Sequence, residues 1–190
     1  MKIRIHEGRG DFKDFDVKPV QGLVIAGTGH RPDKLGGYTE ATDMRLRTLA
    51  CKVLLACGPV RVISGMALGW DMALAEACVM GKIPFDAYIP FNGQESRWQR
   101  REQDRYHELI RQARRVNVSW NLPSMEAFDR RNREMIRDGE VMLALWNGDT
   151  RGGTANAIRD SEAVRREVWN VWPEWEDLLL APPSYPVAPR

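Results

Sequence analysis

Apolar runs that stop abruptly at glycines are the feature that most constrains how this chain can fold. The run Leu23–Ala26 leads directly into Gly27, Thr28 and Gly29. A short all-apolar run is typical of a strand buried on both faces of a sheet, and the glycines predict a tight loop at its end. Residues 60–63 and 140–146 repeat the pattern. The sequence therefore predicts an α/β fold with a doubly wound, mainly parallel sheet and helices on both faces.

Helices and strands are expected to alternate along the rest of the chain. Apolar residues at helical spacing predict helices at 39–57, 71–80, 94–114, 124–138 and 155–167. Further strands are predicted at 84–90, 115–119 and 168–172, the last of them at an edge of the sheet. We divide the chain into an N-terminal arm or edge strand (1–21), one domain (22–172) and a Pro-rich tail (173–190), which we expect to run as an extended strap.

The composition is that of a globular protein and excludes some function classes. The 190 residues are 43% hydrophobic with a formal net charge of +2, which argues against a nucleic-acid partner. No apolar run approaches the roughly 20 residues of a membrane span, and the charged start lacks the apolar core of a signal peptide. Cys51, Cys57 and Cys78 have no metal-binding or CxxC spacing, so we expect small buried side chains, no metal, and a cytoplasmic location.

The loop after the first strand is a candidate anion site. Gly27 and Gly29 would let the backbone approach a ligand closely, and Thr28, His30 and Arg31 could meet a negative charge. In an open α/β sheet, ligands bind where the carboxyl ends of strands open into a crevice.

The second strand runs into a loop with Ser64, Gly65, Met66 and Gly69, followed by a helix from Asp71. The first amides of a helix have no intrahelical acceptor and its dipole attracts anions, so this loop is a second candidate site for phosphate or carboxylate. We interpret Asp71 as the N-cap of this helix in preference to a ligand of a ribose hydroxyl.

The strand at 140–146 is followed by Gly152, Gly153 and Thr154, with Thr154 as the expected N-cap of the next helix. We expect the three loops to converge on one crevice. Asn132 falls on the apolar stripe of the 124–138 helix, where its amide must bond either to the protein or to a ligand. Trp98 is expected in the core, with stacking on a base as the alternative.

Taken together, these motifs resemble the SLOG superfamily, which includes the DprA/Smf proteins and the LOG phosphoribohydrolases. The chain is most similar to the YpsA-like branch, through the segments 27–32, 64–71, 90–98, 131–135 and 152–154. The resemblance implies a Rossmann-like fold that binds nucleotides or their derivatives, including ADP-ribose-like molecules. Carried over by position, it places a set of loop residues in the site: Gly27, Thr28, Gly29, Arg31, Ser64, Gly65, Gly69, Asp71, Gly152, Gly153 and Thr154, with Gln94 and Asn132 as weaker candidates. We add His30 and Met66 from the same loops.

One departure from the family bears on catalysis. The phosphoribohydrolase motif has a catalytic glutamate where this chain has Asn156, and an amide cannot act as a base. We therefore expect a sensor or sequestering protein for a nucleotide-type ligand. The alternative is an N-glycosidic hydrolase of nucleoside 5′-monophosphates that uses Glu76 or Asp71. Single-stranded DNA binding is a third hypothesis. Family members often self-associate, which leaves a homo-oligomer open, and the Trp-rich end (Trp169, Trp172, Trp175) is either an interface or an anchor for the tail.

Overall fold

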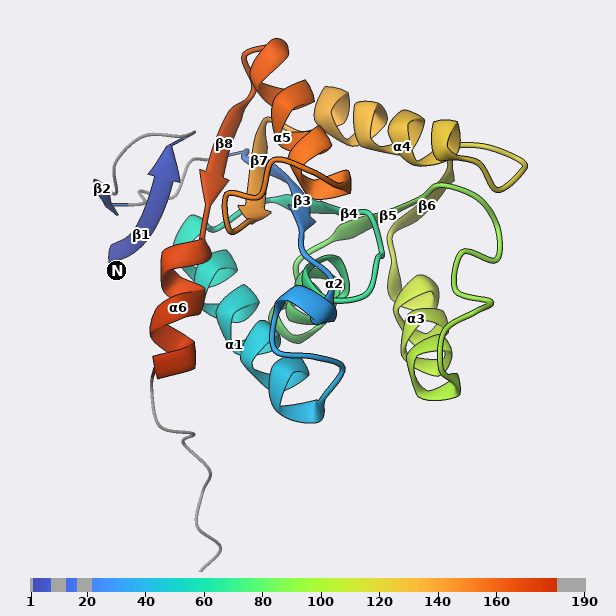
Figure 1. Cartoon of the computed structure of the whole chain (residues 1–190), viewed down its shortest axis with the longest axis horizontal. Helices are drawn as coiled ribbons and strands as arrows, with labels where there is room; N and C mark the ends of the chain where they lie inside the picture. Colours follow the sequence, from blue (N-terminus) through green and yellow to red (C-terminus); the bar gives the residue numbers. More distant parts are fainter. Residues whose placement is uncertain (1, 8–12, 17–21, 181–190) are drawn as a thin grey trace, which may run out of the picture.

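The fold is built on one eight-stranded sheet. The computed structural model describes residues 2–7, 13–16 and 22–180. The strands lie in the order β2-β1-β8-β7-β3-β4-β5-β6 (Figure 1). Their bounds are β1 Lys2–Glu7, β2 Lys13–Asp16, β3 Val24–Gly29, β4 Arg61–Ser64, β5 Phe85–Ile89, β6 Arg115–Val118, β7 Val141–Leu145 and β8 Glu167–Asn170.

Six of the strands are parallel, from β8 to β6. The central strand β3 pairs with β7 on one side and β4 on the other, so that Ile25 lies opposite both Val141 and Val62. The predicted doubly wound α/β class is confirmed. β1 pairs antiparallel with β8, and β2 antiparallel with β1. The prediction that the segment 168–172 is an edge strand is wrong, because β8 lies between β7 and β1.

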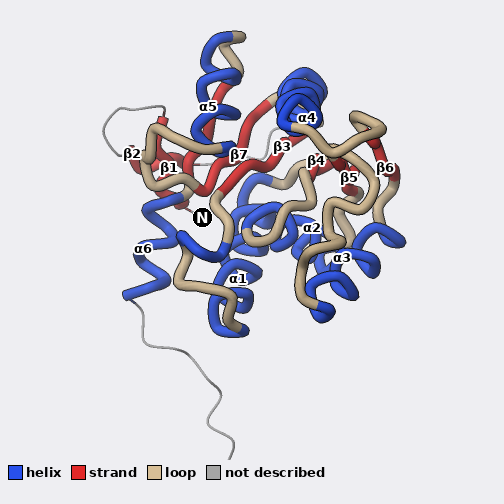
Figure 2. The backbone as a smooth tube through the Cα atoms, turned by 45° about the vertical axis from the view of Figure 1, so that its right-hand side comes forward, coloured by secondary structure: helices blue, strands red, loops and turns tan. Residues whose placement is uncertain are grey.

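Helices cover both faces of the sheet. They are α1 Glu40–Cys57, α2 Trp70–Gly81, α3 Arg100–Gln112, α4 Met125–Asp138, α5 Gly153–Ala163 and α6 Trp172–Leu180, with a 3-10 turn at Pro32–Lys34. Helices α4 and α5 lie on one face, and α1, α2, α3 and α6 on the other (Figure 2). Each face has its own apolar cluster, around Trp70 and Leu46 on the α1–α2 side and around Ile63 and Met135 on the α4–α5 side.

Local chemistry explains where several helices begin and end. Thr39 caps α1 by accepting a hydrogen bond from the Thr42 amide (3.1 Å), and Ser124 caps α4 in the same way. Gly58 ends α1 with φ +57°, a left-handed conformation that suits glycine. No helix among the described residues is both long enough and apolar enough to cross a membrane.

Three segments differ from the sequence-based expectation. The helix expected at 155–167 ends at Ala163, and Glu167 already belongs to β8. The helix expected at 94–114 begins only at Arg100, because residues 94–97 form turns. The tail does not start as an extended strap: residues 172–180 form α6, which is held by the fully buried Trp175. Pro173 is compatible with this helix because it lies at the start, where a proline removes no intrahelical hydrogen bond. Residues 181–190 of the expected tail lie outside the described part of the chain.

Candidate functional site

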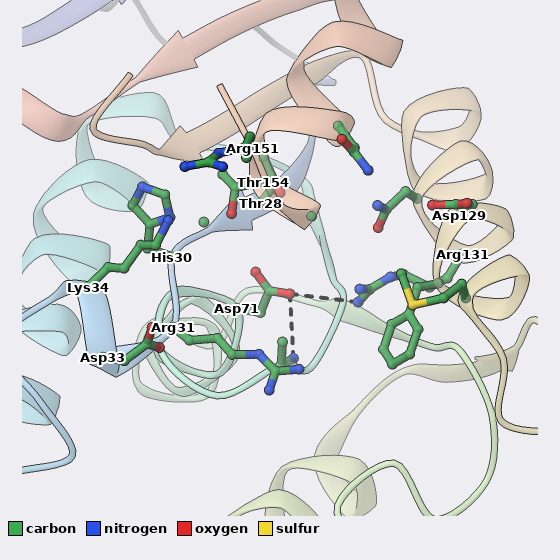
Figure 3. Close-up of a pocket in the computed structure, with 18 residues that line it drawn as sticks. Thr28, His30, Arg31, Asp33, Lys34, Asp71, Asp129, Arg131, Arg151 and Thr154 are labelled. Carbon is green, nitrogen blue, oxygen red and sulfur yellow. Dashed lines mark hydrogen bonds and ion pairs between the residues drawn. The ribbon is translucent and has the colours of Figure 1, made fainter. Parts of the chain in front are cut away.

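A cavity of about 430 Å³ opens at the carboxyl edge of the sheet. Its wall is formed by residues 28–31 at the end of β3 and just after it, by Ala67 and Asp71 before and in α2, by residues 151–154 before and in α5, and by one face of α4 (Figure 3). The structure thus brings the three glycine loops together, as the sequence predicts. Gly27 borders a second, smaller cavity of about 20 Å³, which shares Thr28, Asp71 and Arg131 with the main one.

The two glycines of β3 are required mainly by helix packing. A Cβ atom at Gly27 would lie 2.3 Å from Leu74 Cδ1, and one at Gly29 would lie 2.6 Å from Trp70 Cβ. Helix α2 therefore crosses directly over these positions. We expected both glycines to let a ligand approach the backbone, but their contacts with α2 indicate a role in helix packing. Gly29 also lines the cavity.

Helix α2 begins differently from the prediction. Its N-cap is Gly69, with φ +95°, and Asp71 lies in the first turn, so the interpretation of Asp71 as the N-cap is wrong. A Cβ atom at Gly69 would lie 2.6 Å from the His30 carbonyl oxygen, and no other residue fits there. Ser64 holds the loop from below: its hydroxyl donates to the Asp71 carbonyl (2.8 Å) and accepts from the Met66 amide (3.1 Å). Both Ser64 and Met66 are buried outside the cavity wall.

Helix α5 begins with two glycines at the cavity. Gly152 is the N-cap, with φ +99°, and Thr154 lies in the first turn, so the interpretation of Thr154 as the cap is wrong. A Cβ atom at Gly152 or Gly153 would meet nothing within 4 Å. The packing of the described residues therefore does not require a glycine at position 153, in contrast to Gly27 and Gly29.

A buried ion pair links α2 and α4 at the floor of the cavity. Arg131 Nη1 lies 3.8 Å from Asp71 Oδ2 and donates to the Gly65 carbonyl oxygen at 2.6 Å. Among the described residues, Asp71 Oδ1 and Arg131 Nε have no hydrogen-bond partner. Burial raises the pKa of Asp71 to about 6, although Arg131, the Ala67 amide and Arg31 all oppose the shift. Burial likewise lowers the pKa of Arg131.

Arg131 is a site residue that sequence reasoning did not select. It lies four positions from both Ala127 and Met135, on the face of α4 that turns toward the sheet. From the sequence we defined the buried face of this helix by its apolar residues only, and we therefore assigned no role to an arginine on that face. The signal was present, since an arginine at helical spacing from core residues must find a buried partner.

The other predicted site residues separate into two groups. Asn132 is half-buried and lines the cavity, which favours a ligand contact over the structural alternative. Gln94 does not line the cavity; its side-chain amide donates to the carbonyl oxygen of Met66, in the loop before α2, at 3.4 Å. Glu76, the other catalytic candidate, does not line this cavity and accepts hydrogen bonds from Arg105 at 2.8 and 3.0 Å. Trp98 packs against Tyr106 in the core and is not in the cavity wall.

His30 has a largely structural position. Its ring is 4% exposed, lies edge-on to Trp172, and has Nε2 2.7 Å from Asn147 Oδ1. Burial lowers the pKa of His30, which favours the neutral form of the ring. The histidine therefore holds the loop after β3 to the loop after β7 and borders the cavity from there.

Charged groups of both signs face the cavity. Arg31 and Arg151 line it, and neither side chain has an ion-pair or hydrogen-bond partner among the described residues. Lys34 is paired with Asp149 (2.5 Å). The described residues contain no group of three or more His, Cys, Asp or Glu side chains that could hold a metal ion.

The family comparison agrees with this arrangement of loops. The sequence model of the YspA SLOG family matches residues 25–168. The chain belongs to this family. The resemblance that the motifs suggested is thereby confirmed, and the matched range of this SLOG chain contains all three loops and α4. No curated protein matches the chain.

Solved structures share the fold of this SLOG chain at low sequence identity. DNA processing protein A (DprA) from Helicobacter pylori, described for its single-stranded DNA binding mode, has 19% identity and a TM-score of 0.56, covering 85% of this chain and 74% of that one. DprA from Streptococcus pneumoniae has 14% identity and a TM-score of 0.54 over 78% of this chain. The match spans 50% of that DprA chain. The structural-genomics target TM1055 has 14% identity and a TM-score of 0.51, covering 77% and 72% of the two chains.

Proposed function

We propose that the cavity binds a nucleotide or nucleotide-derived small molecule and that the protein acts as a non-catalytic sensor or sequestering protein. One observation carries the proposal: the N-termini of α2 and α5 open into the same cavity as Arg31 and Arg151, two arginines whose side chains have no partner among the described residues. Unpaired helix amides and guanidinium groups are the standard partners of phosphate in proteins.

The shape of the α5 turn supports a phosphate at that end of the cavity. Gly153 leaves open space where a side chain would stand, so that an anion could approach the first amides of the helix. Asp71 Oδ1 has no hydrogen-bond partner in the described structure, and this oxygen could accept a hydrogen bond that a ribose hydroxyl donates. The volume of about 430 Å³ is within the range of about 300–1,000 Å³ that small-molecule sites occupy.

Calorimetric titration tests the proposal directly. The panel contains AMP, ADP-ribose, NAD and cyclic ADP-ribose isomers, and we expect micromolar or tighter binding of at least one member. The Gly153→Ala variant should lose this binding while it remains folded. Absence of binding across the panel would contradict the proposal.

A second candidate function is hydrolysis of the N-glycosidic bond of a nucleoside 5′-monophosphate. The observation that favours it is Asp71, a cavity carboxyl whose pKa is raised to about 6 by burial and which keeps one oxygen without a partner. In this reaction water adds to C1′ of the ribose, the bond to the base breaks, and the base leaves with a proton that a neutral carboxyl can supply. Asn156, which lines the cavity, supplies no carboxylate.

Chromatographic detection of free base separates the two functions. Release of adenine from AMP that is abolished by Asp71→Asn and retained by Glu76→Gln would establish the hydrolase. Binding without release supports the sensor.

Single-stranded DNA binding is the third hypothesis, and the fold shared with DprA is its only support. The basic residues of α3 are largely neutralised: Arg105 pairs with Asp43, Glu76 and Glu102, and Arg100 with Asp104. A surface of alternating, paired charges releases few counterions on binding DNA. We therefore expect no gel shift with an oligonucleotide, and a shift that weakens steeply with salt would contradict this expectation.

A further inference from the structure

One face of α4 lines the cavity with side chains that change from apolar to polar along the helix. Met125, Phe128, Asp129 and Asn132 all line the cavity, and they lie at positions i, i+3, i+4 and i+7 of the helix. This spacing places them in a single stripe. The stripe begins with two apolar side chains and continues with a carboxylate and an amide. It is separate from the buried face of α4, which holds Arg131.

The apolar part of the stripe offers a flat ring a surface to pack on. The Phe128 ring is held edge-to-face against Phe91, with centroids 5.5 Å apart, so its position is fixed by the protein. Met125 is 74% exposed at the cavity, although a side chain of this type is usually covered. Thioether and aromatic groups are both suited to contact with the face of a base.

The polar part of the stripe lies across the cavity from the proposed phosphate position. Arg151 and Thr154 are on one side of the cavity in Figure 3, and Asp129 is on the other. A nucleotide with its phosphate at the N-terminus of α5 would therefore direct its base toward α4.

Asp129 differs from Glu134 and Asp138, two other acidic residues of the same helix. Glu134 accepts hydrogen bonds from Asn117, Ser119 and Arg130, and Asp138 accepts them from Tyr88 and Arg137. Asp129 has no hydrogen bond or ion pair with any described residue, and it is half-buried in the cavity wall. A carboxylate in this position accepts hydrogen bonds and cannot donate them, so it selects a ligand edge that presents N–H groups.

We infer that α4 recognises the base of the bound nucleotide and that Asp129 makes the site select guanine, an inference that rests on the proposed nucleotide-binding function. Guanine presents two adjacent donors, N1–H and the 2-amino group, which one carboxylate accepts together. Adenine presents only its 6-amino group at the corresponding edge. The amide of Asn132, one helical turn from Asp129, donates to O6 of guanine.

The test uses calorimetry with four nucleotides that differ only at the base: GMP, IMP, XMP and AMP. IMP lacks the 2-amino group, and XMP carries a carbonyl oxygen in its place. We expect the wild-type protein to bind GMP about tenfold more tightly than AMP, with IMP between them, because an unmatched polar edge weakens binding. In Asp129→Asn, the new amide donates to the 2-carbonyl, so XMP should bind more tightly than GMP while AMP changes by less than about twofold.

The matched control is Glu126→Gln, which removes the same charge from an exposed position of α4 outside the cavity wall. It should leave all four affinities unchanged. Equal affinities for the four nucleotides, or an Asp129→Asn variant without a reversed preference for XMP over GMP, would overturn the inference and leave the nucleotide-binding function intact. If none of the four nucleotides nor any ligand of the earlier panel binds, both fail.

Discussion

Arg131 on α4 donates a 2.6 Å hydrogen bond to the carbonyl oxygen of Gly65, the residue that follows β4. The same guanidinium is the only ion-pair partner of Asp71 among the described residues. One side chain thus joins a helix on one face of the sheet to the loop that begins the helix on the other. A side chain at position 65 would collide with this guanidinium, because a Cβ atom at Gly65 would lie 2.0 Å from Arg131 Nη1.

Replacement of Arg131 tests the importance of this link. Arg131→Met keeps an unbranched side chain that can fill part of the space but leaves Asp71 in a buried position without its cation. We expect the free energy of unfolding to fall by about 3–5 kcal/mol. Urea denaturation measures the change. Arg130→Met is the control on the exposed side of α4, and a loss of similar size there would contradict the specific role of Arg131.

The raised pKa of Asp71 predicts a pH dependence with a definite sign. Burial raises the folded-state pKa to about 6 from 3.8, so the folded protein holds this proton more tightly than the unfolded chain. The stabilisation is fully present below pH 3.8 and is lost as the pH rises through 6. Between those values, the free energy of unfolding of the wild type should decrease relative to Asp71→Asn by on the order of 2–3 kcal/mol.

Carboxyl ¹³C NMR provides the direct measurement for Asp71, with an expected midpoint near pH 6. Asp149 serves as a comparison because its pKa shifts in the opposite direction: hydrogen bonds from Lys34 and the Arg151 amide lower it. Its contribution to stability is lost as the pH falls. A titration of Asp71 at or below the ordinary aspartate value would show that burial does not dominate at this site.

The two classes of glycine predict two different mutant phenotypes. A Cβ atom at Gly29 would lie 2.6 Å from Trp70 Cβ, so Gly29→Ala should destabilise the fold by about 1–3 kcal/mol. Gly153→Ala meets open space and should leave stability unchanged or slightly raised, since alanine restricts the unfolded chain. Thermal unfolding compares the two variants, and a destabilised Gly153→Ala would mean that the protein itself requires this glycine.

Arg31 and Arg151, which have no side-chain partner in the described part of the chain, should contribute to ligand binding and not to folding stability. Arg31→Ala and Arg151→Ala should each weaken the binding of AMP by about tenfold or more, because each removes a charged hydrogen-bond donor to phosphate. Neither should change the free energy of unfolding by more than about 0.5 kcal/mol. Arg133→Ala is the matched control, an exposed arginine of α4 outside the cavity wall. Equal effects of all three on AMP binding would indicate only a general charge effect.

The C-terminal helix is expected to be part of the core. Trp175 of α6 is fully buried in the apolar cluster that contains Leu46 and Trp70, so Trp175→Ala should lower the free energy of unfolding in urea by about 3–5 kcal/mol. Leu180→Ala, at a position that is 84% exposed, should change stability by less than about 0.5 kcal/mol. A mild effect of Trp175→Ala would restore the interpretation of this segment as a strap on the surface.

The sequence alone determined the class of fold and predicted that the three glycine loops meet at one crevice. Apolar runs such as Leu23–Ala26 specify buried strands, because alternation is lost where both faces of a strand are covered. The glycine loops that follow these runs predict the crevice, since parallel strands end at one edge. Both patterns are local in the sequence, and each indicates one kind of structure.

Only the tertiary structure decided the roles of individual side chains. Asp71 and Thr154 satisfy the composition rule for an N-cap, but Gly69 and Gly152 occupy the cap because the incoming loops require positive φ at those positions. The same polar residues therefore face the cavity from the first helical turns. Gly27 and Arg131 owe their identities to contacts with Leu74 and Gly65, which are distant in the sequence. A contact between distant segments leaves no periodic signal in the chain, so it is fixed only when the sheet brings them together.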